Sequence, residues 1–128
     1  MTGPELDRAL RVTTAESDGV VVLEVVGEVD MATSPRLRAE VSRLLDTRPT
    51  VLVIDLRQVV FFGSTGISML VEAEHHARRL GVPLGIAATQ PTVLRPLAAT
   101  EVDTLVTVRP DPAMAAAAVL GDTRPEAS

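Results

Sequence analysis

Apolar residues in this chain fall into runs that fit strands and stripes that fit helices. Residues 10–16 alternate loosely between apolar and polar side chains, and residues 20–26 form an almost continuous apolar run. Ser17-Asp18-Gly19 separates the two segments and is typical of a hairpin turn, so they are predicted to pair as antiparallel strands. A third run, residues 50–56, is apolar enough for a central strand that is covered on both faces.

Two longer segments have the spacing of amphipathic helices. The first follows Asp30, with Ser34 as its predicted N-cap and Pro35 as its first helical residue. Its apolar stripe consists of Leu37, Val41, Leu44 and Leu45. The second helix is predicted to begin at Ser64 and to end at Gly81, a residue type common just after a helix. Its predicted core-facing residues are Ile67, Leu70, Val71, Ala77 and Leu80.

The last third of the chain repeats the alternation of strand and helix. Residues 82–88 are predicted to form a short buried strand, and residues 105–108 the last one. Between them a helix opens at Pro91, and we expect it to be short or kinked because Pro96 falls inside it. An alanine-rich helix then runs from Asp111-Pro112 to Gly121.

This order of elements predicts a single α/β domain. Crossover helices make the later strands largely parallel, and the opening hairpin adds an antiparallel element to the mixed sheet. We place the domain at residues 8–120 and interpret residues 1–7 and 122–128 as flexible tails.

Composition removes several classes of function. The chain has no cysteine and no lysine, which excludes thiol nucleophiles, thiolate metal sites, lysine Schiff bases and the phosphate-binding lysine of a P-loop. The net charge of −5 argues against direct nucleic-acid binding. No apolar run approaches the roughly 18 residues of a membrane span, so we expect a cytoplasmic protein without membrane contact.

Other candidates for catalysis or metal binding are weak. His75 and His76 are adjacent on a helix and therefore point about 100° apart, which does not make a paired metal site. Ser64 lacks the pattern of a hydrolase nucleophile, because Phe62 stands where the Gly-x-Ser-x-Gly turn requires a glycine. We therefore expect no catalytic residues, no metal and no cofactor.

The most informative segment is residues 59–70, where a small-residue turn opens the second helix. It brings Ser64 and Thr65 to the positive end of that helix, where an added phosphate is electrostatically favoured. The same hydroxyls could instead serve only as helix caps. Phe61 and Phe62, the only aromatic residues, are expected to point one inward and one outward.

Gly63-Ser64-Thr65-Gly66, together with Gly27-Glu28-Val29-Asp30, resembles the STAS domain family, in particular bacterial anti-sigma factor antagonists. The resemblance extends over about residues 8–120 and implies the same mixed α/β architecture. It also implies that an anti-sigma serine kinase phosphorylates Ser64, with Thr65 as the backup acceptor. The chain departs from the family pattern at Gly63, where the family has an acidic residue.

The resemblance further implies a partner-binding surface at one end of the sheet. Its expected residues are Asp30, Met31, Thr33, Ser34, Gly63, Ser64, Thr65, Gly66 and Ile67. Asp30 could equally serve to order the turn from strand to helix. Two functions stay open: a phosphorylation-controlled antagonist that binds the anti-sigma kinase, or a STAS module that binds a protein or ligand without being phosphorylated. We expect a monomer or a weak dimer.

Overall fold

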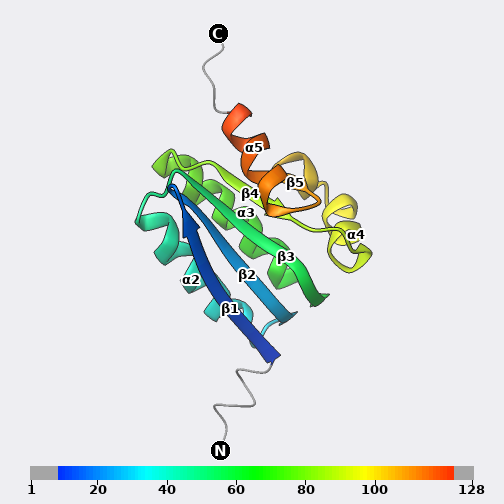
Figure 1. The fold of residues 1–128 in the computed structure, drawn as a ribbon. Coiled ribbons are helices and arrows are strands. Elements are labelled where there is room, and N and C mark those ends of the chain that lie inside the picture. Colours follow the sequence, from blue (N-terminus) through cyan, green and yellow to red (C-terminus); the bar gives the residue numbers. More distant parts are fainter. Residues whose placement is uncertain (1–8, 123–128) are drawn as a thin grey trace, which may run out of the picture.

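The computed structural model describes residues 9–122, which form five strands in one sheet with the order β1-β2-β3-β4-β5 (Figure 1). β1 pairs antiparallel with β2, and every other neighbouring pair of strands is parallel. The strand bounds are β1 Leu10–Ser17, β2 Val20–Val29, β3 Val51–Phe62, β4 Leu84–Ala87 and β5 Thr107–Arg109. The predicted mixed α/β fold is thus confirmed. The predicted tails lie outside the described residues, apart from residue 122, which ends the last helix.

Helices cover the two faces of the sheet unequally. Helices α2 and α3 lie along one face, and α5 crosses the other over β3, β4 and β5 (Figure 1). The helix bounds are α2 Ser34–Asp46, α3 Ser64–Leu80, α4 Pro91–Ala99 and α5 Pro112–Asp122, with a 3-10 turn η1 at Val102–Thr104. None of the helices described here is long and apolar enough to cross a membrane.

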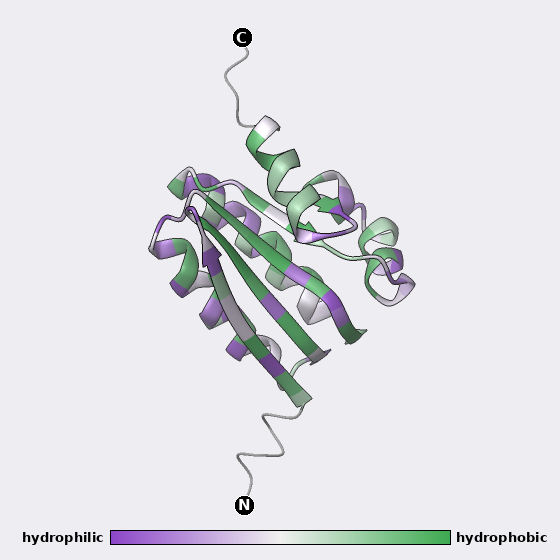
Figure 2. Ribbon diagram, in the orientation of Figure 1, coloured by the Kyte–Doolittle hydropathy of each residue, from purple (hydrophilic) through white to green (hydrophobic). Residues whose placement is uncertain are grey.

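The buried core has two parts, one for each covered face. The larger part joins β2 and β3 to α2, α3 and α4, and includes Leu23, Ile54, Leu45, Leu70 and Leu97. The smaller part packs Val51 and Val53 of β3 against Ala115, Ala116 and Val119 of α5. Because β3 is buried on both faces, its first six residues can all be apolar or enclosed, and Figure 2 shows this as a long hydrophobic stretch.

Both strands that lead to the candidate site are longer than predicted. β2 continues to Val29 and β3 to Phe62, with shifts in their register after Glu24 and after Gly27. Beyond Asp55, β3 has no partner in β4, and the side chain of Gln90 supplies the missing donors. Its Nε2 donates to the carbonyl oxygens of Leu56 and Val59, each at 2.8 Å. Gln90 is far from these residues in the sequence. The local pattern of apolar residues therefore could not show that the strand continues past residue 56.

Two smaller expectations are corrected and one is confirmed. The N-cap of α2 is Thr33, and Ser34 is already helical. Helix α4 is short, as expected, and keeps Pro96 within its nine residues. The last strand begins at Thr107, two residues later than predicted, because residues 102–104 form the 3-10 turn.

Candidate functional site

The candidate site lies where β2 and β3 end side by side. Val29 pairs with Phe62 at the last step of the parallel ladder, and the backbone N–H of Gly63 donates to the carbonyl of Val29 at 3.0 Å. The chain leaves the sheet at both points and enters α2 and α3. Asp30 and Ser64 therefore belong to neighbouring turns, as expected for residues that follow the carboxyl ends of parallel strands.

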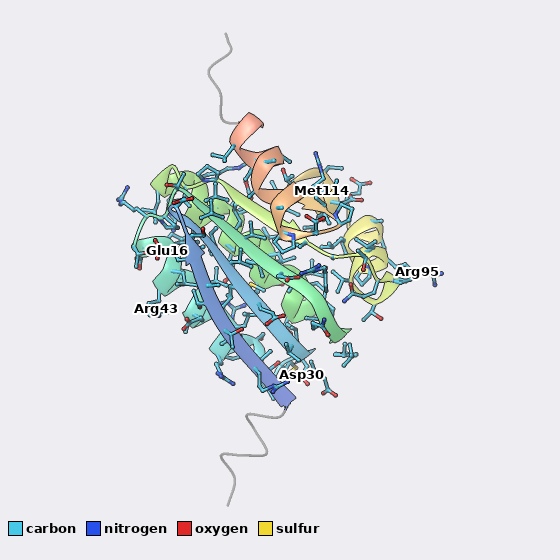
Figure 3. All side chains as sticks on the ribbon, in the orientation of Figure 1. Glu16, Asp30, Arg43, Arg95 and Met114 are labelled. Atoms are coloured by element: carbon cyan, nitrogen blue, oxygen red, sulfur yellow. The ribbon has the colours of Figure 1, made fainter. Side chains whose placement is uncertain are left out.

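Asp30 orders the turn between β2 and α2. One of its oxygens, Oδ1, accepts from the backbone N–H groups of Ala32 at 2.9 Å and Thr33 at 3.0 Å. The hydroxyl of Thr33 donates to the carbonyl of Glu28 at 2.7 Å and accepts from the N–H of Asp30 at 3.0 Å. These bonds fix the backbone that carries Met31 at the tip of the turn. The turn-ordering interpretation of Asp30 is therefore confirmed. Figure 3 shows Asp30 at this end of the sheet.

The second turn begins α3 with two hydroxyl residues in different environments. Ser64 is exposed at the first helical position, and its side chain makes no hydrogen bond within residues 9–122. The hydroxyl oxygen of Thr65, by contrast, is enclosed and also has no partner among the described residues. The N-cap residue is Gly63, which has no side chain to accept from the first N–H groups.

The two glycines of this turn differ in what they require. Gly63 has φ −90° and ψ −173°, ordinary extended backbone. An added Cβ would lie 3.2 Å from the ring of Phe61 and, in ordinary contact, 3.7 Å from the carbonyl oxygen of Val29. Gly66 is buried, and its Cβ would lie 2.7 Å from the ring of Phe62. Phe62 is 5% exposed and Phe61 is 51% exposed, which confirms that one ring points inward and the other outward. Close packing on Phe62 therefore fixes the identity of Gly66.

A shallow groove of about 440 Å³ joins the two turns. Its lining residues are Asp30, Met31, Ala32, Phe61, Gly63, Ser64 and Thr65. Met31 and Phe61 are among the most exposed large apolar side chains of the described chain, at 80% and 51%. Exposed apolar side chains beside a hydroxyl form a surface suited to binding another protein, which we call the docking groove.

The other residues predicted for the partner surface lie beneath it. Thr33 and Ser34 are buried under the first turn, and Gly66 is buried behind the second. Ile67 is partly buried against the core. Ala32, which also lines the groove, was not among the residues expected for the partner surface, although it lies in the segment that the sequence placed at this end of the sheet.

The histidines lie away from the docking groove. His76 Nε2 is 3.0 Å from Asp46 Oδ1, so this side chain ties α3 to α2. Among residues 9–122 no three histidine, aspartate or glutamate side chains are grouped so as to hold a metal ion.

Fold and site together define a small α/β binding domain. Its candidate site is a helix that begins with hydroxyl residues, at the edge of a mixed sheet where the parallel strands have their carboxyl ends. The chain belongs to the STAS domain family, whose profile matches residues 11–115. It is 33% identical over 97 residues to the anti-sigma-F factor antagonist RsfB of Mycobacterium tuberculosis, covering 76% of each chain. The family resemblance found in the sequence is thereby confirmed.

Solved structures give the same assignment. The crystal structure of an anti-sigma factor antagonist from Mycobacterium paratuberculosis matches with a TM-score of 0.81 and 31% identity, covering 88% of this chain and 96% of that one. A protein of Thermotoga maritima matches with a TM-score of 0.78 over 89% of this chain and 98% of that one. Its identity is 17%, so this likeness shows the fold alone.

Proposed function

We propose that this chain is a cytoplasmic anti-sigma factor antagonist that binds an anti-sigma serine kinase through the docking groove and is released when Ser64 is phosphorylated. The observation that carries the proposal is the position of Ser64, which is exposed at the start of α3 and lines the same groove as Met31 and Phe61. The relationship to RsfB supports the antagonist role. Binding is the output of this protein, and phosphorylation is the switch.

The switching reaction is a phosphoryl transfer from ATP bound to the kinase. Ser64 Oγ attacks the γ-phosphorus, a new Oγ–P bond forms, and the bond from that phosphorus to the β,γ-bridging oxygen breaks. ADP leaves with the electron pair, and the hydroxyl proton passes to a base of the kinase or to solvent. An exposed hydroxyl without an internal hydrogen bond is available for this attack.

Charge explains why the modification releases the partner. A phosphoserine carries about −1.5 to −2 charges at neutral pH, and an interface must desolvate that charge when it closes. The groove already contains the carboxylate of Asp30 and offers apolar side chains on both turns. Closing such a surface over a phosphate is unfavourable, so the phosphorylated protein dissociates.

The enclosure of the Thr65 hydroxyl oxygen supports Ser64 as the acceptor. Thr65 Oγ1 is inaccessible to solvent in the folded domain, whereas Ser64 is exposed one residue earlier. A kinase cannot place ATP in line with an enclosed oxygen. Ser64 is therefore the acceptor in this proposal, and Thr65 is not its substitute.

Intact-mass analysis after incubation with ATP and the candidate anti-sigma kinase tests the switch. Wild type and Thr65→Val are expected to gain one phosphoryl group, and Ser64→Ala none, while Ser64→Ala keeps its affinity for the kinase within about threefold because a serine hydroxyl without a partner contributes little to binding. Ser68→Ala is the matched control, since Ser68 is an exposed serine one turn later on α3. A phosphoryl group on Ser64→Ala would contradict the assignment. A stable complex without any modification would instead favour the STAS module that binds without being phosphorylated.

A second prediction concerns the apolar part of the docking groove. Met31→Ser and Phe61→Ser are each expected to weaken kinase binding about tenfold or more, because exposed aromatic and methionine side chains serve as anchors in protein interfaces. Calorimetric titration measures the effect. Leu94→Ser is a matched control, because Leu94 is an exposed apolar residue on α4 outside the groove. Equal losses for all three variants would show that the groove is not the contact surface.

A further inference from the structure

We infer that phosphorylation of Ser64 also stabilises the domain, because the phosphate supplies the helix cap that Gly63 leaves open. This inference rests on the proposed function, in which Ser64 is the modified residue. It adds a second consequence to the switch: the released form of the protein is more resistant to unfolding than the form that binds.

The start of α3 has unsatisfied donors in the described structure. The first intrahelical bonds run from the N–H groups of Gly66 and Ile67 to the carbonyl of Gly63, at 2.9 and 3.3 Å. The N–H groups of Ser64 and Thr65 find no acceptor within residues 9–122. Side-chain capping normally satisfies such groups, and Gly63 has no side chain.

A second observation at the same turn points to an acceptor that is missing from the unmodified protein. Thr65 Oγ1 is enclosed and unpartnered among the described residues, which is uncommon for a buried hydroxyl. Two backbone N–H groups without an acceptor therefore lie at the start of α3, and the unpartnered hydroxyl of Thr65 belongs to the same turn. A phosphoryl group on Ser64 brings three strong acceptor oxygens to them.

One nearby charge opposes the effect. The carboxylate of Asp30 lines the same groove, but its Oδ1 already accepts from two backbone N–H groups and the groove is open to water. Repulsion between solvent-exposed charges is weak, whereas hydrogen bonds from a helix start to a phosphate are charge-assisted and strong. The balance favours stabilisation.

The test uses the full chain with phosphoserine inserted at position 64 during translation, so that its outcome does not depend on any kinase. The midpoint of thermal unfolding is expected to rise by about 3 to 5 °C relative to the unmodified protein. Phosphoserine at position 68, within α3 and past the free N–H groups, is the matched control and is expected to give no rise. An unchanged or lower midpoint for phosphoserine at position 64 would overturn the inference.

Gly63→Asn and Gly63→Asp separate capping from simple charge effects. The extended backbone of Gly63 accepts both side chains, with only the half-exposed ring of Phe61 to move aside. Each is expected to raise the midpoint of the unmodified protein slightly and to remove most of the gain from phosphoserine, because the cap is already filled. A full phosphoserine gain in Gly63→Asn would refute the capping mechanism. If the kinase does not modify Ser64, the proposed function fails. The unfolding midpoints of the phosphoserine proteins still test the capping inference, because they do not depend on the kinase.

Discussion

Gly27→Ala is expected to destabilise the domain by about 3 kcal/mol or more, through backbone strain and a collision with the neighbouring strand. Gly27 has φ +118°, a conformation that residues with a side chain rarely adopt. An added Cβ would lie 2.3 Å from the carbonyl oxygen of Ala9 and 3.0 Å from its carbon. These are backbone atoms of the chain entering β1, so no rotation of a side chain relieves the contact. Denaturant unfolding measures the loss.

Gly81→Ala is the matched control for that substitution. Gly81 also has a positive φ, +71°, but a Cβ there would meet no atom within 4 Å. It is expected to cost only about 1 to 2 kcal/mol, the cost of the left-handed conformation alone. Equal losses in the two variants would mean that the collision at Gly27 contributes nothing and that β1 moves aside freely.

Gly27 also shows what the sequence could predict and what it could not. The segment Gly27-Glu28-Val29-Asp30 is identified by its resemblance to the family, and its position beside Ser64 follows from strand order. That Gly27 lies within β2, opposite Leu10, depends on pairing with a separate strand earlier in the chain. The sequence predicts that the two segments pair, but the close approach of Ala9 to Gly27 leaves no mark in the local pattern of apolar residues.

The same reasoning applies to the candidate site. The helix start at Ser64, the inward and outward phenylalanines and the shared sheet edge all follow from local signals, namely small residues, apolar spacing and strand direction. The different exposure of Ser64 and Thr65 does not, because both are small hydroxyl residues at a helix start. Tertiary packing around the start of α3 encloses the hydroxyl oxygen of Thr65 and leaves Ser64 exposed.

Gly66→Ala is expected to destabilise the domain by about 2 kcal/mol and to slow phosphorylation of Ser64 in the folded protein. The new methyl group would lie 2.7 to 3.0 Å from three atoms of the Phe62 ring, which is itself buried. Either the ring leaves its place in the core or the first turn of α3 shifts away from the sheet. The second response moves Ser64 relative to the docking groove. Thermal unfolding and the initial rate of phosphoryl gain, measured well below the unfolding midpoint, report the two effects.

Gly121→Ala and Phe62→Leu provide the controls. A Cβ on Gly121, also in a helix, meets no atom within 4 Å, so the same substitution there is expected to be neutral or slightly stabilising. Phe62→Leu removes the ring atoms that the methyl group added by Gly66→Ala would strike, at its own cost of about 1 to 2 kcal/mol for lost packing. The double variant is therefore expected to be more stable than the sum of the two losses predicts and to recover the rate of phosphorylation. Strict additivity, with the rate still low, would show that contact with Phe62 does not set the position of Ser64.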